Sequence, residues 1–162
     1  MIRVSNFPAR DREAFLRNLR EALNAGDCVL IGFDLVKDIE VMTRAYNDAE
    51  GITAAFNKNI LTRINRELAA DFDPGRFRFY STWDVEACAV QSYLISTCAH
   101  QVHIGRLSQS FGFSAREAIH TESSHKFTRH QTREMAARNG FTVAAEFTDG
   151  AGYFTDCLWR AA

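Results

Sequence analysis

Long apolar runs are missing from this sequence. No stretch approaches the roughly 20 residues needed to span a bilayer, and residues 1–15 contain no hydrophobic signal-peptide core. Hydrophobic residues still make up 46% of the 162-residue chain and charged residues 24%, which is typical of a folded globular protein. We therefore expect a soluble, cytoplasmic protein of one domain, or of one domain with an insertion, and no membrane partner.

An excess of either charge is also missing. The chain has 19 Lys and Arg residues against 20 Asp and Glu residues, a formal net charge of −1. This balance gives no general attraction to polyanions, so nucleic acid is not an expected partner. The cysteines have no Cys-x-x-Cys spacing and are expected to be reduced thiols. They are Cys28, Cys88, Cys98 and Cys157.

A glycine-rich phosphate loop is the third absence. Neither the Gly-x-Gly-x-x-Gly pattern of dinucleotide-binding folds nor the P-loop pattern occurs. The glycines that could be considered stand alone: Gly26, Gly32, Gly51 and Gly75. The strand–loop–helix unit that usually binds a cofactor in this fold class is therefore not expected in this chain.

The order of the patterns that are present predicts an α/β protein. Ile2–Asn6 is a short apolar stretch, and a helix pattern over about Asp11–Leu23 follows it and ends near Gly26. Cys28–Val36 is nearly all apolar, which is typical of a parallel strand buried on both faces. Strand, helix and strand at this spacing predict a βαβ unit.

The middle of the chain has a different pattern. It predicts two helices, Ile39–Ala49 and Thr53–Ala69, and then hairpin strands between Phe77 and Ile104, where the apolar residues alternate. The second helix carries an apolar stripe formed by Phe56, Ile60, Leu61, Ile64 and Leu68.

The end of the chain returns to the first pattern. We predict a helix over Lys126–Arg138, ended by Asn139-Gly140, and an antiparallel pair of strands, Phe141–Phe147 and Tyr153–Trp159. The predicted organisation is therefore an α/β portion at residues 1–37, an insert of two helices and antiparallel strands at 38–125, and a return to the first sheet at 126–162.

Cys98, His100 and His103 have the side chains of a metal site, and Cys88 is a further candidate ligand. In a strand, however, Cys98 and His100 point to one face and His103 points to the other. A tetrahedral zinc site also needs a fourth ligand at structural spacing, and none is evident. We therefore predict no metal site.

The segment before the last predicted helix concentrates polar side chains. If it is extended, His120, Glu122 and Ser124 share a face. This suits an imidazole, because the carboxylate can accept from one ring N–H while the hydroxyl satisfies the other nitrogen. The alternative is a solvated strand in which Ser123 or Ser124 caps the following helix, and the segment alone favours that alternative.

Asn6 and Tyr46 are further candidates for a ligand site. In open α/β sheets the residues just past a strand's carboxyl end face the ligand crevice, which favours Asn6 and Asp34–Lys37. Asn6 can both donate and accept hydrogen bonds, and Tyr46 offers a hydroxyl. A turn-forming Asn and a half-buried core Tyr explain these residues equally well.

Several strings of the sequence together resemble one known family. They are Gly26–Asp38, Ala45–Asp48, Gly51–Asn57, Arg63–Leu68, Ala70–Asp73 and Thr121–Phe127. In this order they resemble the histidine-specific S-adenosylmethionine-dependent methyltransferases of ergothioneine biosynthesis. The resemblance runs through essentially the whole chain.

The resemblance implies an α/β fold: the C-terminal half of a Rossmann-like methyltransferase domain interrupted by an α+β substrate-binding insert. It implies S-adenosyl-L-methionine as cofactor and L-histidine, or a related amino acid, as substrate, with three methylations of the α-amine giving hercynine. Asn6 and Tyr46 would hold the backbone end of the amino acid, and Thr53 would line the pocket. Glu122 and Ser124 would hold the imidazole.

The chain departs from the family's pattern at three positions. Ser5 stands where a Gly usually precedes the Asn, and Phe147 stands where a Trp is usual. Ser92 stands where members commonly carry a Met against the imidazole. Because this change removes apolar contact, we expect a substrate pocket at Ser92 that is looser or differently selective.

Length is the largest departure. The family's cofactor-binding half, with its glycine-rich loop, would lie before Met1, so this chain alone is not expected to bind S-adenosylmethionine or to methylate histidine. Three explanations stay open. A complementary N-terminal half on another chain, or self-association, could complete the enzyme; the gene could be truncated; or the chain could be a non-enzymatic remnant or amino-acid-binding module.

Overall fold

The computed structural model describes residues 2–162, and it describes the backbone alone for Ile2 and Arg3. The chain divides into two compact units. Unit 1 consists of Met1–Asp38, Asp84–Ala89 and Ser123–Ala162, and unit 2 consists of Ile39–Trp83 and Val90–Glu122. Within the described residues, no helix has both the length and the apolar character needed to cross a membrane.

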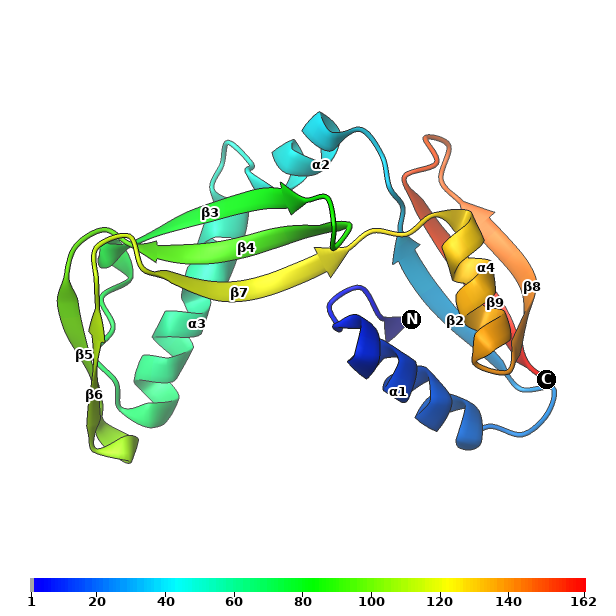
Figure 1. Ribbon diagram of the computed structural model, residues 1–162, viewed down its shortest axis with the longest axis horizontal. Helices are drawn as coiled ribbons and strands as arrows, with labels where there is room; N and C mark the ends of the chain where they lie inside the picture. The colour runs from blue at the N-terminus through cyan, green and yellow to red at the C-terminus, as the bar shows by residue number, and fades with distance from the viewer. Residues whose placement is uncertain (1) are drawn as a thin grey trace. The chain divides into compact units, whose positions relative to one another are not determined.

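Unit 1 is built on a four-stranded sheet with the strand order β1-β2-β9-β8 (Figure 1). Its elements are β1 (Ile2–Arg3), α1 (Ala9–Glu21), β2 (Cys28–Asp34), α4 (Arg129–Arg138), β8 (Phe141–Thr148) and β9 (Phe154–Ala161). β1 is parallel to β2, which confirms the predicted βαβ unit. β9 is antiparallel to both β2 and β8, so the antiparallel pair predicted at the end of the chain is also confirmed.

Both helices of unit 1 pack on the same face of its sheet. Leu16 of α1 and Met135 of α4 belong to one buried cluster with Phe33 of β2 and Trp159 of β9. On the other face of β2, the Leu30 side chain is 40% exposed. The prediction that this strand is buried on both faces is therefore wrong, because α1 and α4 cover only one of them.

Unit 2 contains a three-stranded sheet with the order β3-β4-β7 and a separate two-stranded sheet, β5-β6. Its elements are α2 (Ile39–Tyr46), α3 (Ile52–Leu68), η1 (Pro74–Arg76), β3 (Phe77–Asp84), β4 (Ala89–Ser96), β5 (His100–Ile104), η2 (Gly105–Leu107), β6 (Gln109–Phe113) and β7 (Ala118–His125). The two predicted helices are confirmed, and strands form where they were predicted between Phe77 and Ile104, but β5 pairs with β6 rather than with β4. Strand β6 was not predicted. Residues 118–125 form strand β7, so the condition for His120, Glu122 and Ser124 to share a face is met.

Helix α3 runs behind β4 and β7 in Figure 1 and covers one face of the three-stranded sheet. Leu61 of α3 lies in a buried cluster with Phe77 and Leu94 of the strands. Phe56 is 71% exposed and Ile60 is 44% exposed. The predicted apolar stripe is therefore split, because positions 57, 61 and 64 form one helix face and positions 56 and 60 form another.

The helix predicted from Lys126 begins at Arg129 instead. Thr128 is its N-cap: the Thr128 hydroxyl accepts from the Gln131 backbone N–H at 3.2 Å, and the Gln131 side chain accepts from the Thr128 N–H at 2.8 Å. Ser123 and Ser124 therefore do not cap this helix and belong to β7. The helix ends at Arg138, before Asn139 and Gly140, as predicted.

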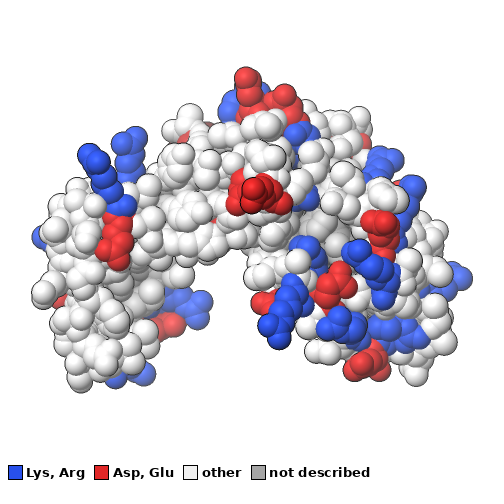
Figure 2. Space-filling model, in the orientation of Figure 1, with Lys and Arg blue, Asp and Glu red and all other residues white. Residues whose placement is uncertain are grey.

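The units differ from the predicted organisation in their bounds and in one turn. Unit 2 begins at Ile39 and ends at Glu122 rather than spanning residues 38–125, and, as a second difference, the β3–β4 turn, Asp84–Ala89, groups with unit 1. A backbone hydrogen bond of 2.8 Å from Lys126 N–H to the Cys88 carbonyl explains the second difference. On the face drawn in Figure 2, charged side chains gather over α1 and α4 of unit 1, whereas the middle of the β3-β4-β7 sheet of unit 2 is largely uncharged.

Candidate functional site

Strand β7 presents His120 and Glu122 on one side, because side chains alternate along a strand. The His120 Nε2 atom lies 2.8 Å from Oε1 of Gln91 on β4. The His120 ring packs on the ring of Tyr93, with 5.2 Å between the centroids. These contacts fix the polar side of β7 against β4. Glu122 is half-buried on this strand, where a carboxylate can accept from an N–H group.

Thr121 lies on the opposite side of β7 and joins it to α3. Its hydroxyl is 2.6 Å from Oδ1 of Asn57 and 3.1 Å from the carbonyl of Ser92. Asn57 is 5% exposed, and its amide donates to the Thr53 carbonyl at 3.0 Å. Ser92 is fully buried and lies on the same face of β4 as the buried Leu94. The structure therefore brings Thr53 and Ser92 together through Asn57 and Thr121, within the interior of unit 2.

Ser124 lies in unit 1, where a buried lysine holds it. Lys126 Nζ donates to the Ser124 hydroxyl oxygen at 2.8 Å and lies 2.8 Å from Oδ2 of Asp34. The Lys126 side chain is only 1% exposed, so its charge must be paired. Asp34, at the carboxyl end of β2, also binds Lys37 through its other oxygen. A serine, an aspartate and two lysines thus form one polar network.

Asn6 lies in the exposed turn after β1. The Ser5 hydroxyl donates to Oδ1 of Asn6 at 3.2 Å, and the Ser5 carbonyl accepts from the His125 N–H at 2.9 Å. Because His125 follows Ser124 directly, the structure brings the Asn6 turn to the end of β7 within unit 1. Asp34 is also anchored here, since its carbonyl accepts from the Phe127 N–H at 3.0 Å.

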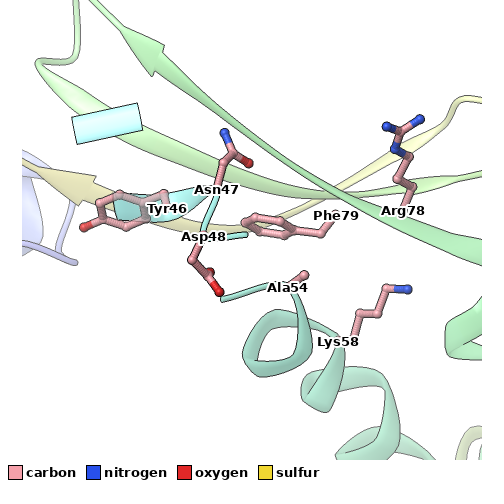
Figure 3. Close-up of a pocket in the computed structure, with 7 residues that line it drawn as sticks. All are labelled: Tyr46, Asn47, Asp48, Ala54, Lys58, Arg78 and Phe79. Atoms are coloured by element: carbon pink, nitrogen blue, oxygen red, sulfur yellow. The ribbon is translucent and has the colours of Figure 1, made fainter. Parts of the chain in front are cut away.

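Tyr46 and Thr53 flank the connection between α2 and α3. The Asp48 carboxylate accepts from the N–H groups of Ile52 and Thr53 at 2.6 and 2.9 Å and so caps α3. The hydrogen bond from the Thr53 side chain, followed by those from the backbone, lowers the pKa of Asp48. Tyr46 is half-buried and lines a cavity of about 340 Å³. In Figure 3, Tyr46 lies at one end of this cavity, with Lys58 and Arg78 at the other.

The sequence interpretation missed Lys126 and Asn57. A single Lys between the polar residues of a strand and the buried Phe127 indicates a buried ion pair, and Asp34 at the end of an apolar run is a suitable partner. For Asn57 the signal is weaker: a polar residue on the buried face of an amphipathic helix needs a hydrogen-bond partner. Neither signal identifies the partner.

The candidate metal ligands have ordinary partners instead. The His100 ring stacks on Phe113 with 5.4 Å between centroids, and Nδ1 of His103 lies 3.1 Å from the Ser110 hydroxyl. Cys98 and Cys88 carry free thiols. Across residues 2–162, the structure places no three His, Cys, Asp or Glu side chains where they could hold one metal ion.

Comparison with known families identifies this arrangement. A family described as histidine-specific, SAM-dependent methyltransferase matches residues 3–161, nearly the whole chain. The chain belongs to this family. The segment that carries Glu122, Ser124 and Lys126 lies within the match, as do Asn6, Tyr46 and Thr53.

Two curated relatives are histidine N-alpha-methyltransferases. The protein of Mycolicibacterium smegmatis is 38% identical and that of Mycobacterium tuberculosis 36% identical, each over 151 residues. Ergothioneine biosynthesis protein 1 of Schizosaccharomyces pombe is 27% identical over 145 residues. The two mycobacterial matches cover 93% of this chain and 47% of those proteins, so the chain spans about half the length of these two relatives. The Schizosaccharomyces pombe match covers 89% of this chain and 18% of that protein. Among solved structures, the alignment with the CcbJ methyltransferase of Streptomyces caelestis covers 98% of this chain and 53% of the CcbJ chain. The two are 12% identical with a TM-score of 0.41, so this likeness adds nothing to the family assignment.

The described residues do not fit the family's cofactor. A nucleotide cofactor needs close backbone approach at a glycine-containing turn that leads into a helix. The turn between β1 and α1, residues 4–8, contains no glycine. Gly26 follows a helix and Gly32 is buried inside β2. Gly51 does precede a helix, α3, but its turn follows α2 rather than a strand, and Asp48 already binds the first N–H groups of α3. Asp34, the carboxylate beyond β2, is already bound by two lysines.

Proposed function

We propose that this chain supplies the histidine-binding side of a methyltransferase that trimethylates the α-amine of L-histidine to hercynine. The family match over residues 3–161 supports this proposal, as does the identity to two histidine N-alpha-methyltransferases. The observation that carries it is the polar strand β7, in which a half-buried carboxylate and a buried hydroxyl are two residues apart.

Glu122 and Ser124 would bind the imidazole of the substrate. Lys126 Nζ donates to the oxygen of Ser124, so the hydroxyl hydrogen is the group that Ser124 would offer to a ligand. In this proposal Ser124 donates to the unprotonated ring nitrogen, and the Glu122 carboxylate accepts from the ring N–H. Such a pair selects a neutral imidazole in one orientation.

Asn6 and Tyr46 would hold the backbone end of the amino acid, and Thr53 would help to shape the pocket. Asn6 is kept in place by Ser5, and Tyr46 is followed by the Asp48 cap that orders the start of α3. Ser92 would contribute through its carbonyl, which accepts from Thr121 next to Glu122. These residues bind and orient the substrate, and such positioning is a large part of what a protein contributes to group transfer.

The cofactor side would come from polypeptide other than these 162 residues. S-adenosylmethionine supplies an already activated methyl group, and the residues described here offer it no site. β1 lies at the edge of its sheet and is only two residues long. An edge of this kind can pair with a further strand, so we expect the isolated chain to be oligomeric or poorly soluble without a partner.

Complementation tests this function. The chain is co-expressed with the part of the Mycolicibacterium smegmatis enzyme that the match does not cover, and products from histidine and S-adenosylmethionine are followed by mass spectrometry. We expect trimethylated histidine from the pair and none from either part alone. A well-folded pair that yields no methylated histidine would contradict the proposal and favour the non-enzymatic module.

Calorimetry of the chain alone tests whether the cofactor site lies outside these residues. We expect no measurable binding of S-adenosylmethionine, because residues 2–162 contain no strand that leads through a glycine turn into a helix, the unit that its nucleoside end requires. Micromolar binding to the isolated chain would show that this half holds a cofactor site of its own.

A further inference from the structure

Three basic side chains of unit 2 face two joined cavities. Lys58 and Arg78 line the cavity of about 340 Å³ beside Tyr46. Arg78 also lines a second cavity, of about 590 Å³, together with Arg116 and Tyr80. Asn47, Arg78 and Phe79 border both cavities, so the two spaces adjoin along β3. We call this space the basic groove of unit 2, defined by Lys58, Arg78 and Arg116.

The three cations of the basic groove have no ion-pair partner among the residues that the structure describes. Within residues 2–162, none of them forms an ion pair or a side-chain hydrogen bond. Other arginines of the same unit do: Arg63 and Arg66 pair with Glu67 at 3.0 and 3.3 Å. Unit 2 therefore pairs some of its cations with carboxylates, but not those of the groove.

One carboxylate, that of Asp48, lines the groove, and it already accepts hydrogen bonds from α3. Asp48 accepts from the first N–H groups of α3 at 2.6 and 2.9 Å. Figure 3 shows its carboxylate turned toward the start of α3, whereas the Lys58 and Arg78 side chains lie at the other end of the cavity. Asp48 thus leaves the positive charge at that end uncompensated.

Aromatic and backbone groups shape the rest of the groove. Phe79 lies between the two ends of the first cavity in Figure 3. Tyr80 is 50% exposed at the second cavity. Arg116 has a left-handed backbone with φ of 71°, and its N–H donates to the Ser96 carbonyl at 2.8 Å, which anchors this residue at the second cavity.

We propose that the basic groove of unit 2 binds an organic oxyanion with two or more negative charges, either a phosphate ester or a polycarboxylate. Three positive charges without partners favour a multiply charged ligand, and guanidinium groups bind both phosphate and carboxylate oxygens in a fork. The two cavities exceed the size of a single inorganic ion, and the exposed Tyr80 ring offers apolar contact to a carbon framework. Lys58, Arg78 and Arg116 belong to none of the contacts assigned to the histidine of the proposed function, which reaches only Tyr46, at the other end of the first cavity.

Titration calorimetry of the full chain tests this site. Pyrophosphate and citrate are the multiply charged probes and acetate is the singly charged one, all at constant ionic strength. We expect saturable binding of one molecule of pyrophosphate or citrate per chain and none of acetate. Binding of pyrophosphate alone identifies a phosphate ester as the ligand class, and binding of citrate alone identifies a polycarboxylate.

Variants decide whether the groove is responsible. The double variant Lys58→Ala/Arg78→Ala should weaken binding about ten-fold or more, because each charged hydrogen bond contributes appreciably to affinity. Arg106→Ala is the matched control, since Arg106 is an exposed arginine of the same unit outside both cavities. Absence of saturable binding, undiminished binding in the double variant, or an equal loss in the control would each overturn the proposal.

Discussion

The two units hold their candidate histidine-binding residues by different forces. In unit 1, Ser124 is fixed by a buried ammonium, Lys126, that also pairs with Asp34. In unit 2, Thr121, next to Glu122, is fixed by uncharged groups, the Asn57 amide and the Ser92 carbonyl. One unit therefore relies on a buried ion pair and the other on neutral hydrogen bonds.

This difference predicts how much stability each unit loses when one of these residues is substituted. A buried charge that loses its partner is strongly destabilising, whereas a neutral hydrogen bond contributes less. Substitutions in the network of unit 1 should therefore cost more stability than those in the hydrogen-bond chain of unit 2. The predictions below test that order.

The largest expected effect is that of Lys126→Met. The substitution removes a side chain that is 1% exposed, breaks the pair with Asp34 and leaves Ser124 without its donor. We expect a loss of about 3 kcal/mol in the free energy of unfolding, measured by chemical denaturation. Lys58→Met is the control, because that lysine has no ion pair, and it should change stability by less than about 0.5 kcal/mol. Equal losses in the two variants would contradict the account of unit 1.

Asn57→Leu should have the next largest effect. It keeps the size of the side chain but removes the contacts with Thr121 and with the Thr53 carbonyl. We expect a loss of about 2 kcal/mol in the free energy of unfolding, nearly independent of salt because no charge is involved. Asn59→Leu, an exposed position on the same helix, should change little. A loss that grows or shrinks strongly with salt would contradict the neutral character assigned to unit 2.

The smallest expected effect is the pH dependence of the α3 cap. Hydrogen bonds from Thr53 and from the backbone lower the pKa of Asp48 in the folded chain. The ionised Asp48 therefore contributes its full stabilisation at pH values above the ordinary carboxyl pKa. This stabilisation is lost as the pH falls through the lowered pKa of the folded chain. We expect Asp48→Ala to lower the denaturation midpoint at neutral pH, with a difference from the parent chain that shrinks below about pH 4.

Glu50→Gln, a nearby exposed position, serves as the control for this pH series. Its denaturation midpoint should equal that of the parent chain at every pH. If the denaturation midpoints of Asp48→Ala and the parent chain differed by the same amount down to acid pH, the Asp48 charge would not stabilise α3.

Local patterns predicted much of this fold because they depend on neighbours in the sequence. The shared face of His120, Glu122 and Ser124 could be stated on the condition that the segment is extended, which it is, and the spacing of strand and helix predicted the βαβ unit of unit 1. Both follow from the periods of regular backbone structure. The antiparallel strands at the end of the chain were predictable for the same reason.

Contacts between distant segments could not be predicted in this way. The amphipathic pattern of α3 included Phe56, but only the folded unit shows that the Leu61 side meets the sheet and the Phe56 side does not. The pair formed by Lys126 and Asp34 joins segments far apart in the sequence, so neither residue identifies the other. The polar residues near Glu122 were recognisable, but the groups that hold them in place were not.

The affinity of the complemented enzyme for L-histidine tests the central claim most directly. Calorimetric titrations would compare the parent pair with pairs that carry Glu122→Gln, Ser124→Ala or, as a control, Glu50→Gln. If Glu122 and Ser124 bind the imidazole, each of the first two substitutions weakens histidine binding about ten-fold or more and the control leaves it unchanged. Unchanged affinity in both Glu122→Gln and Ser124→Ala would contradict the assignment of β7 as the imidazole-binding strand.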